Sequence, residues 1–173
     1  MPDVHDPVTR SRNMAAIRSK DTKPELLIRS GLHRLGYRFR VTRKDLIGKP
    51  DIVFSGLHAV IFVNGCFWHG HNCRLFRLPG TRTEFWKTKI NTNQKRDNTV
   101  RSALLSDGWR VAIVWECALK GKGRLNLQEV LTELTTWLES TESLLEIRAR
   151  DLSPESVSSM DTSKATEPNP TNR

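Results

Sequence analysis

The residues best suited to metal chemistry follow directly after a run of apolar β-formers that ends at Val63. Cys66, His71 and Cys73 supply sulfur and imidazole ligands there. Cys117 follows a second apolar run far downstream. Structural Zn²⁺ sites take four such ligands in a tetrahedron, so these four residues could form one zinc site.

The spacing of these ligands leaves two alternatives open. A local four-ligand site could form without Cys117, from the neighbouring candidates Cys66, His69, His71 and Cys73. The cysteines could instead be small buried hydrophobic side chains, which is the usual environment of a free cysteine. If Cys117 completes the zinc site, His69 is left for other chemistry.

Asp51 is the carboxylate best placed for phosphate chemistry. It opens one short apolar run, and the next apolar run ends at Val63. A carboxylate at the start of one strand, beside the end of the next, is an arrangement in which nucleases hold Mg²⁺ against a scissile phosphate. A Pro-Asp pair before a strand is usually only a turn, so this signal depends on the basic residues and the histidine nearby.

Three aromatic residues offer a stacking surface close to these ligands. Phe67 and Trp68 are consecutive, so a loop pinned by a metal ion cannot easily bury both. Exposed aromatic side chains beside basic residues can wedge between base pairs, and Trp86 lies in a basic segment that could extend such a surface. The alternative is that one or both of the consecutive aromatics pack in the core.

Charge is unevenly distributed along the chain. Residues 1–125 carry 24 Lys and Arg against 10 Asp and Glu, a balance of +14. Residues 126–173 carry 4 against 9, a balance of −5. A basic body of this kind attracts polyanions, of which nucleic acid is the commonest in the cytoplasm, although a solvated basic surface is the alternative.

With 173 residues, the chain is long enough for one domain with an ordinary hydrophobic core. No stretch approaches the roughly 18 consecutive apolar residues of a membrane span, and the N-terminus has no apolar signal region. We therefore expect a soluble, unexported protein. Its three cysteines would then lie in a reducing compartment, which favours metal ligation or burial over disulfides.

Two helices have clear start signals. Thr22 and Glu25 have the spacing of a capping box, and apolar residues at helical spacing follow, which predicts a helix over residues 23–35. Asn126 and Glu129 form a second such pair and open an amphipathic helix.

A third helix and the sheet itself are predicted from the remaining pattern. Residues 83–106 are polar and compatible with a helix, with weak helix formers at 91–99 that allow for a bend or a break. Alternating or continuous apolar runs predict the strands of one sheet. These segments are residues 37–41, 51–54, 58–63 and 109–115.

Taken together, the sequence resembles the very-short-patch repair (Vsr) endonucleases from the N-terminus to about residue 140. The matching motifs are Asp3-Val-His-Asp6, Thr9-Arg-Ser-Arg-Asn-Met14, Lys49-Pro-Asp51, Ile61-Phe62, Gly65-Cys-Phe-Trp-His69 with His71 and Cys73, Thr81-Arg-Thr-Glu-Phe-Trp86, Arg96-Asp97, Gly108-Trp-Arg-Val111 and Val114-Trp-Glu-Cys-Ala-Leu119. As a set, these motifs are highly specific.

The resemblance implies an α/β fold like that of type II restriction endonucleases, with a mixed sheet flanked by helices and a structural zinc site. It implies a strand-specific DNA endonuclease that nicks next to the T of a T:G mismatch, the product of 5-methylcytosine deamination, and so starts very-short-patch repair. Double-stranded DNA with this mismatch is the expected partner, and mismatch-repair proteins are candidates. A monomer in the cytoplasm, associated with the nucleoid, is expected.

The resemblance also implies roles for individual residues. Mg²⁺ is expected on Asp51 and on backbone and phosphate oxygens near Val63. His69 is expected to be the general base, oriented by Asp97, with Glu25 supporting the site. The zinc on Cys66, His71, Cys73 and Cys117 would be structural, and the residues expected to intercalate into DNA are Phe67, Trp68 and Trp86.

Two features qualify the match. Family members often have a histidine two residues before the cysteine of Gly-Cys-Phe-Trp-His, where this chain has Asn64. The strand that ends at Val63 also lacks the lysine of restriction-type motifs, which is typical of the Vsr group. Two other functions stay open: a zinc-stabilised restriction-like endonuclease on unmismatched sites, and a DNA-binding module without catalysis.

Three segments are expected along the chain: a DNA-contacting arm over residues 1–21, an endonuclease domain over 22–146 and a tail over 147–173. The tail is rich in Ser, Thr, Pro and charged residues, and we expect it to be disordered. Basic residues of the arm are expected to contact phosphates, which positions a protein on DNA without reading sequence. They are Arg10, Arg12, Arg18 and Lys20.

Overall fold

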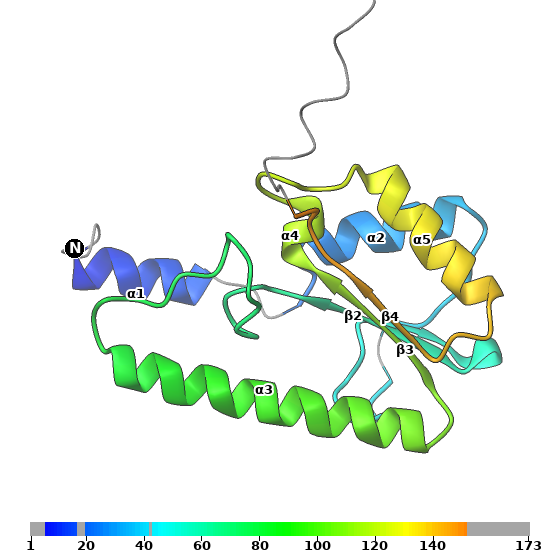
Figure 1. Cartoon of the computed structure of the whole chain (residues 1–173), viewed down its shortest axis with the longest axis horizontal. Helices are drawn as coiled ribbons and strands as arrows, with labels where there is room; N and C mark the ends of the chain where they lie inside the picture. The colour runs from blue at the N-terminus through cyan, green and yellow to red at the C-terminus, as the bar shows by residue number, and fades with distance from the viewer. Residues whose placement is uncertain (1–5, 17–19, 42, 152–173) are drawn as a thin grey trace, which may run out of the picture.

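A four-stranded mixed sheet forms the centre of the molecule in the computed structural model, which describes residues 6–16, 20–41 and 43–151 (Figure 1). The strands lie in the order β1-β2-β3-β4, with β1 antiparallel to β2 and the other two pairings parallel. Their bounds are β1 Ile52–Phe54, β2 Ala59–Asn64, β3 Arg110–Trp115 and β4 Leu144–Ile147.

Helices cover both faces of this sheet. Two of them, α2 and α5, pack on one face of the sheet and on each other. The long helix α3, which follows β2 and precedes β3 in the chain, packs on the other face (Figure 1). The helical segments are α1 Pro7–Ala16, α2 Lys23–Arg34, the 3-10 turn η1 Ser55–Leu57, α3 Thr83–Ser106, α4 Glu116–Leu119 and α5 Leu127–Glu139. This arrangement confirms the predicted α/β class.

Each central strand is buried on both sides, which explains its continuous apolar sequence. In β2, Ile61 and Val63 belong to the core beneath α2 and α5, whereas Val60 faces α3. In β3, Val114 belongs to the core beneath α2 and α5, whereas Val111 faces α3. A strand covered on both faces needs no polar positions, so the alternation typical of half-exposed strands is absent.

One of the predicted strands is wrong. Residues 37–41 form no strand beyond a single bridge between Arg40 and Val53, because the apolar side chains there serve packing: Tyr37 and Phe39 lie edge-on to Phe54 at 6.1 and 5.7 Å. The break allowed for at residues 91–99 does not occur.

The long helix α3 is continuous through residues 91–99, where Asn93 and Gln94 donate hydrogen bonds to the loop after β2. Thr88, Thr92 and Thr99 each donate a hydrogen bond to the carbonyl four residues earlier, at 2.9, 2.9 and 3.0 Å. These bonds satisfy the threonine hydroxyl groups within the helix. The short edge strand β4 has no counterpart among the predicted strands, because most of its side chains are exposed or half-exposed.

The two predicted capping boxes have different outcomes. At α5 the box forms as predicted: Asn126 accepts from the Glu129 N–H at 2.9 Å, and Glu129 accepts from the Asn126 N–H at 2.8 Å. At α2 the helix starts where expected, but the Thr22 hydroxyl donates to the Glu25 carboxylate at 2.9 Å and caps no backbone N–H. Glu25 is used for a polar network instead.

Parts of the arm and tail lie outside this description. Arg18 and the side chain of Arg10 are not among the described residues, nor is the tail beyond residue 151. The folded body continues past β4 as far as Arg150, whose N–H donates to the Gly123 carbonyl at 2.8 Å. No helix within the described residues is long and apolar enough to cross a membrane.

Candidate active site and metal centre

Asp51 lies where β1 begins, at the end of the sheet where β2 finishes. Its carboxylate oxygen Oδ2 accepts a 2.7 Å hydrogen bond from the backbone N–H of Val63. In a β-strand, the N–H and C=O of one residue point to the same side of the strand. Val63 lies two residues beyond Ile61, which is the last β2 residue that pairs with β1. The Val63 carbonyl therefore faces the same edge as the Asp51 carboxylate.

Burial dominates the electrostatics of Asp51. The pKa of its carboxyl is raised to about 6, mainly by burial and also by the charge of Glu25, against lowering contributions from the Val63 N–H, Arg29 and His69. A half-buried carboxylate whose charge is only partly compensated favours a bound cation. Carboxylate and carbonyl oxygens are the ligands that Mg²⁺ prefers, so these two groups fit such an ion.

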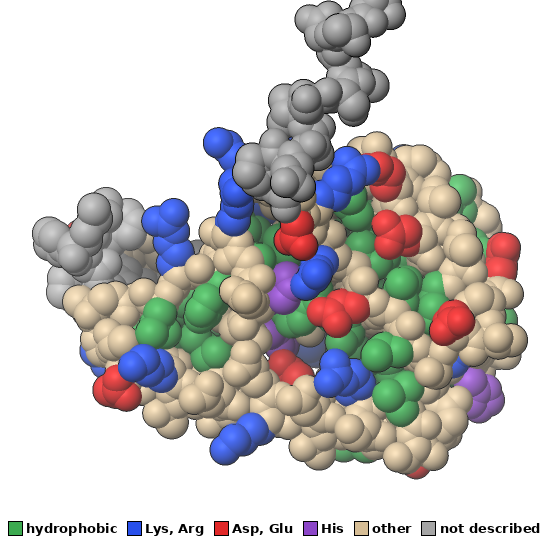
Figure 2. All heavy atoms as spheres, in the orientation of Figure 1, with side chains coloured by type: hydrophobic (Ala, Val, Ile, Leu, Met, Phe, Trp, Pro, Cys, Tyr) green, Lys and Arg blue, Asp and Glu red, His purple; other side chains and the backbone are tan. Residues whose placement is uncertain are grey.

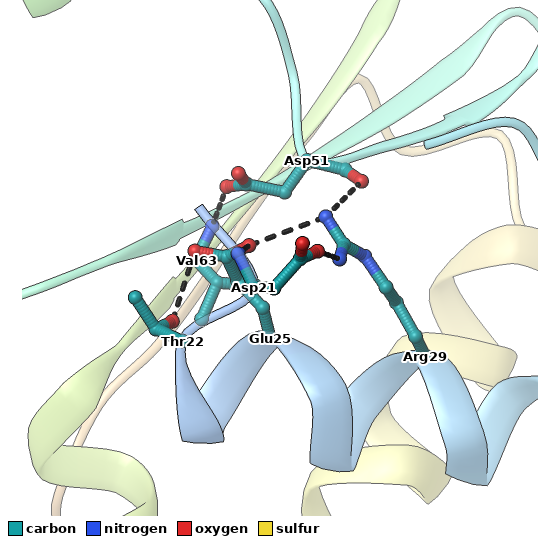
Figure 3. A network of polar contacts seen from close by, with 6 residues as sticks. All are labelled: Asp21, Thr22, Glu25, Arg29, Asp51 and Val63. Carbon is teal, nitrogen blue, oxygen red and sulfur yellow. Dashed lines mark hydrogen bonds and ion pairs between the residues drawn. The ribbon is translucent and has the colours of Figure 1, made fainter. Parts of the chain in front are cut away.

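Glu25 and Arg29 form a polar network behind Asp51 (Figure 3). The Glu25 carboxylate, on the first turn of α2, accepts from the Asp21 N–H at 3.0 Å and from the Arg29 guanidinium at 3.2 Å, besides the Thr22 hydroxyl. Arg29 also donates to the Asp51 carbonyl at 3.1 Å. No motif singles out Arg29; its position four residues after Glu25 is the signal that could have found it.

His69 comes from the loop after β2, and helix α3 holds its ring. Its Nδ1 is hydrogen-bonded to the carboxylate of Asp97, which fixes the orientation of the imidazole. With Nδ1 committed to Asp97, Nε2 is the nitrogen that can accept a proton. The two side chains are 21% and 31% exposed, so solvent and substrate can reach them.

A cavity of about 410 Å³ opens beside this pair. Asn64 lines it from the end of β2, and Asn98 and Arg101 line it from α3. Figure 2 shows histidine side chains in a hollow of this face, with acidic and basic side chains around it. Asn64 thus lies in the wall next to His69, where it can form hydrogen bonds but cannot exchange a proton near neutral pH.

A second group of ligands lies just beyond the ends of β2 and β3. The sulfur atoms of Cys66, Cys73 and Cys117 and a ring nitrogen of His71 all lie within 4.8 Å of one another, so they could hold a metal ion. His71 Nδ1 is 3.6 Å from the Cys66 sulfur and 3.6 Å from the Cys117 sulfur. The structure thus brings Cys117 into the group and leaves His69 outside it.

The environment of this cluster suits a cation. Burial raises the pKa of the Cys66 and Cys117 thiols, and it lowers the pKa of His71. Deprotonation of either thiol would place a negative charge in this partly buried site. A metal ion would stabilise both thiolates. The His71 ring also stacks on Trp115 at 4.1 Å with an interplanar angle of 7°, which fixes its direction.

The loop that carries these residues is fastened to α3. Asn93 donates to the Trp68 carbonyl at 2.8 Å, and Gln94 donates to the Gly70 carbonyl at 3.1 Å. At Gly70, φ is +58°, and an added Cβ would lie 2.5 Å from Ile90 and 2.6 Å from Gln94. The loop approaches the helix closely because this position has no side chain.

Aromatic side chains form a continuous wall beside the loop. Phe67 and Trp68 are 5.2 Å apart, and Trp86 lies 5.3 and 6.0 Å from them. All three are half-buried, so each ring keeps part of its surface accessible. Phe85 extends the wall as an exposed ring, with Arg82 at 4.4 Å over its face.

Basic side chains border this wall. Figure 2 shows hydrophobic side chains gathered at the end of the molecule that holds the β2–α3 loop, with Lys and Arg side chains around them. Helix α1 lies at the same end (Figure 1). Of the arm residues expected to contact phosphates, Arg12 and Lys20 are exposed. This end of the molecule therefore offers stacking surface and positive charge together.

Comparison with known proteins gives this geometry a context. Residues 2–75 match the family described as DNA mismatch endonuclease Vsr. The chain is 49% identical over 138 residues to the DNA mismatch endonuclease Vsr of Escherichia coli, covering 80% of this chain and 88% of that protein. The chain belongs to the Vsr family. It is also 51% identical over 125 residues to the type II nicking enzyme V.XorIIP of Xanthomonas oryzae, covering 72% and 92%.

Other Vsr-like nicking enzymes match at lower identity. The type II nicking enzyme V.NmeAIP of Neisseria meningitidis is 42% identical over 136 residues, covering 78% of this chain and 97% of that protein. The Vsr family has a restriction-endonuclease-like fold, which agrees with the mixed sheet and its flanking helices. As a Vsr-family member, the chain is a DNA endonuclease of mismatch repair.

Proposed function

We propose that the chain is a Mg²⁺-dependent endonuclease that nicks one strand of duplex DNA next to the T of a T:G mismatch. The observation that carries this proposal is the meeting of a half-buried carboxylate, Asp51, with an oriented histidine, His69, at one end of the sheet. We also propose that it acts as a monomer.

His69 is the proposed general base. Because its Nδ1 is bonded to Asp97, its Nε2 takes the proton from the attacking water. The Asp97 carboxylate then stabilises the imidazolium that results. The ring is oriented before substrate arrives, so little of the binding energy is needed to align it.

Asp51 and the Val63 carbonyl are the proposed protein ligands of Mg²⁺. When bound, the ion would offset the negative charge that develops on the phosphate. The Val63 N–H holds the Asp51 carboxylate in place, and the network around Glu25 supports the main chain behind it. Glu25 is thus proposed as a supporting residue of the site.

The metal of the cysteine and histidine cluster is proposed to be structural Zn²⁺. With Zn–S near 2.3 Å and Zn–N near 2.0 Å, the ligand atoms of a tetrahedron lie about 3.5 to 3.8 Å apart. Both sulfur–nitrogen distances of 3.6 Å in the cluster agree with that spacing. Four protein ligands would leave no open position, so this site is proposed to position His69 and the aromatic wall.

The aromatic wall and the arm are the proposed DNA contacts. Phe67, Trp68 and Trp86 would insert beside the mismatch, where a weakly stacked base pair is the easiest to separate. Exposed Arg12 and Lys20 would contact phosphates, together with Arg10 and Arg18 of the same arm. Such contacts fix the position of the protein, whereas the wedge selects the distorted site.

The test is nicking of three DNA duplexes that differ only at one base pair: T:G, T:A and C:G. We expect the protein to nick the T:G duplex in the presence of Mg²⁺ and to stop when EDTA is added. Asp51→Ala should remove nicking while leaving DNA binding, and Asp107→Ala, an exposed acidic residue at the end of α3, is the matched control. Equal nicking of T:A would indicate a restriction-like enzyme, and binding without any turnover a DNA-binding module.

A further inference from the structure

Arg29 brings a permanent positive charge into the carboxylate network at the edge of the sheet (Figure 3). Its guanidinium donates to the Asp51 carbonyl at 3.1 Å, to Glu25 at 3.2 Å and to Asp21 at 2.6 Å. The side chain is 13% exposed, and its Nε has no hydrogen-bond partner among the described residues. A guanidinium remains charged under all physiological conditions, so this position carries a resident cation.

The Glu25 carboxylate already accepts three hydrogen bonds, one of them within an ion pair. One oxygen accepts from the Thr22 hydroxyl, and the other accepts from both the Asp21 N–H and Arg29. The residue is 4% exposed. A metal ion at Glu25 would have to lie beside the positive charge of Arg29 or displace it, and breaking a buried ion pair is costly.

We propose that Arg29 is a positioning residue of the Mg²⁺ site: by pairing with Glu25, it leaves Asp51 as the one carboxylate that the catalytic metal binds. This inference rests on the proposed Mg²⁺-dependent function. Its consequence is weak metal binding by the protein alone, because one carboxylate and one carbonyl are few ligands for Mg²⁺. Phosphate oxygens of the bound DNA would complete the set, so the metal is held firmly only when substrate is present.

The test measures Mn²⁺ binding to the full-length protein without DNA, by electron paramagnetic resonance at about pH 8, where carboxylates are ionised. Arg29→Gln removes the charge and frees Glu25, so the affinity for Mn²⁺ should rise by about fivefold or more. Arg29→Lys keeps the charge and should stay near the wild-type affinity. In the double variant Arg29→Gln/Glu25→Gln, the gain should disappear.

Each outcome separates this inference from the proposed function. Asp51→Asn, made in the wild-type and Arg29→Gln backgrounds, shows whether the bound Mn²⁺ depends on Asp51; if it does not, the proposed Mg²⁺ site is wrong. If binding depends on Asp51 but Arg29→Gln binds no more tightly than wild type, or the gain survives in the double variant, the role of Arg29 is wrong and the Mg²⁺ site stands.

A single substitution decides the question if Arg29→Gln fails to fold, which circular dichroism would reveal. Glu25→Gln in the wild-type background should change Mn²⁺ affinity by less than about twofold, because the proposal keeps Glu25 off the metal. A loss of about tenfold or more would show that Glu25 is itself a ligand and overturn the proposal.

Discussion

Cys66 and Cys117 occupy equivalent positions at the ends of two neighbouring parallel strands. Asn64 pairs with Trp115 in the last register step of β2 and β3, and each cysteine follows two residues later. The backbone N–H of Cys117 donates to the Cys66 sulfur at 3.3 Å. Parallel pairing thus brings together two ligands that are far apart in sequence, and a metal ion between them would join the loop to β3.

Cys117→Ser should release the metal ion and destabilise the protein. The loop and the strand end would lose their common anchor, and the free energy of unfolding should fall by roughly 3 kcal/mol or more. Elemental analysis should find one zinc per wild-type chain and almost none in the variant. His69→Ala is the control, since His69 lies outside the cluster and its loss should leave zinc in place. Full zinc in Cys117→Ser would instead favour the local ligand set that includes His69.

Asp97→Asn should slow nicking without weakening DNA binding. The variant keeps the size of the side chain but removes the negative charge that orients His69 and stabilises its protonated form. General-base catalysis contributes roughly 10²- to 10⁴-fold, so His69→Ala should lose that much and Asp97→Asn a smaller part of it. Single-turnover nicking of a T:G duplex measures the rate, and fluorescence anisotropy measures the Kd. A wild-type rate in Asp97→Asn would exclude this role for Asp97.

Most of the fold could be predicted from the sequence where one local rule dominates. The continuous apolar run before Gly65 predicts a strand buried on both faces, and the Asn126 and Glu129 pair predicts a helix start. Residues 37–41 mislead, because an alternating pattern reports which side chains face the core and not whether the backbone finds a partner. The exposed strand β4 carries too little apolar signal to be found this way.

The residues of the candidate site also differ in how well the sequence predicts them. The close spacing of Cys66, His69 and His71 on one loop makes them visible in the sequence. Arg29 and Gln94 are not visible, since their roles depend on the packing of α2 and α3 against distant segments. Resemblance to a family can supply such partners only at positions where the family motif matches, and contacts particular to this chain require its structure.

Gly70→Ala should destabilise the protein by about 1 to 3 kcal/mol. The new methyl group would lie 2.5 Å from Ile90 and 2.6 Å from Gln94, and the positive φ of +58° disfavours any side chain. The loop would have to move away from α3, which also displaces its neighbour His69. Urea unfolding measures the change in stability, and the nicking rate should fall as well.

Gly56→Ala is the matched control for this substitution. Gly56 lies in the turn η1, where an added Cβ has no heavy atom within 4 Å among the described residues. The same chemical change should therefore leave stability within about 0.5 kcal/mol of wild type. Equal stability of both variants would mean that the loop does not pack on α3 as closely as the structure shows.

Trp68→Ala should weaken binding to mismatched DNA more than binding to matched DNA. The ring of Trp68 is half-buried in the aromatic wall, 6.0 Å from Trp86, and is proposed to stack beside the mismatch. Each stacked base contributes about 1 to 3 kcal/mol, so the Kd for a T:G duplex should rise roughly 5- to 150-fold. Trp109→Ala is the control, because Trp109 precedes β3 at the other end of the sheet and packs on His58. If the two variants bind T:G DNA alike, the wall is not the mismatch-reading surface.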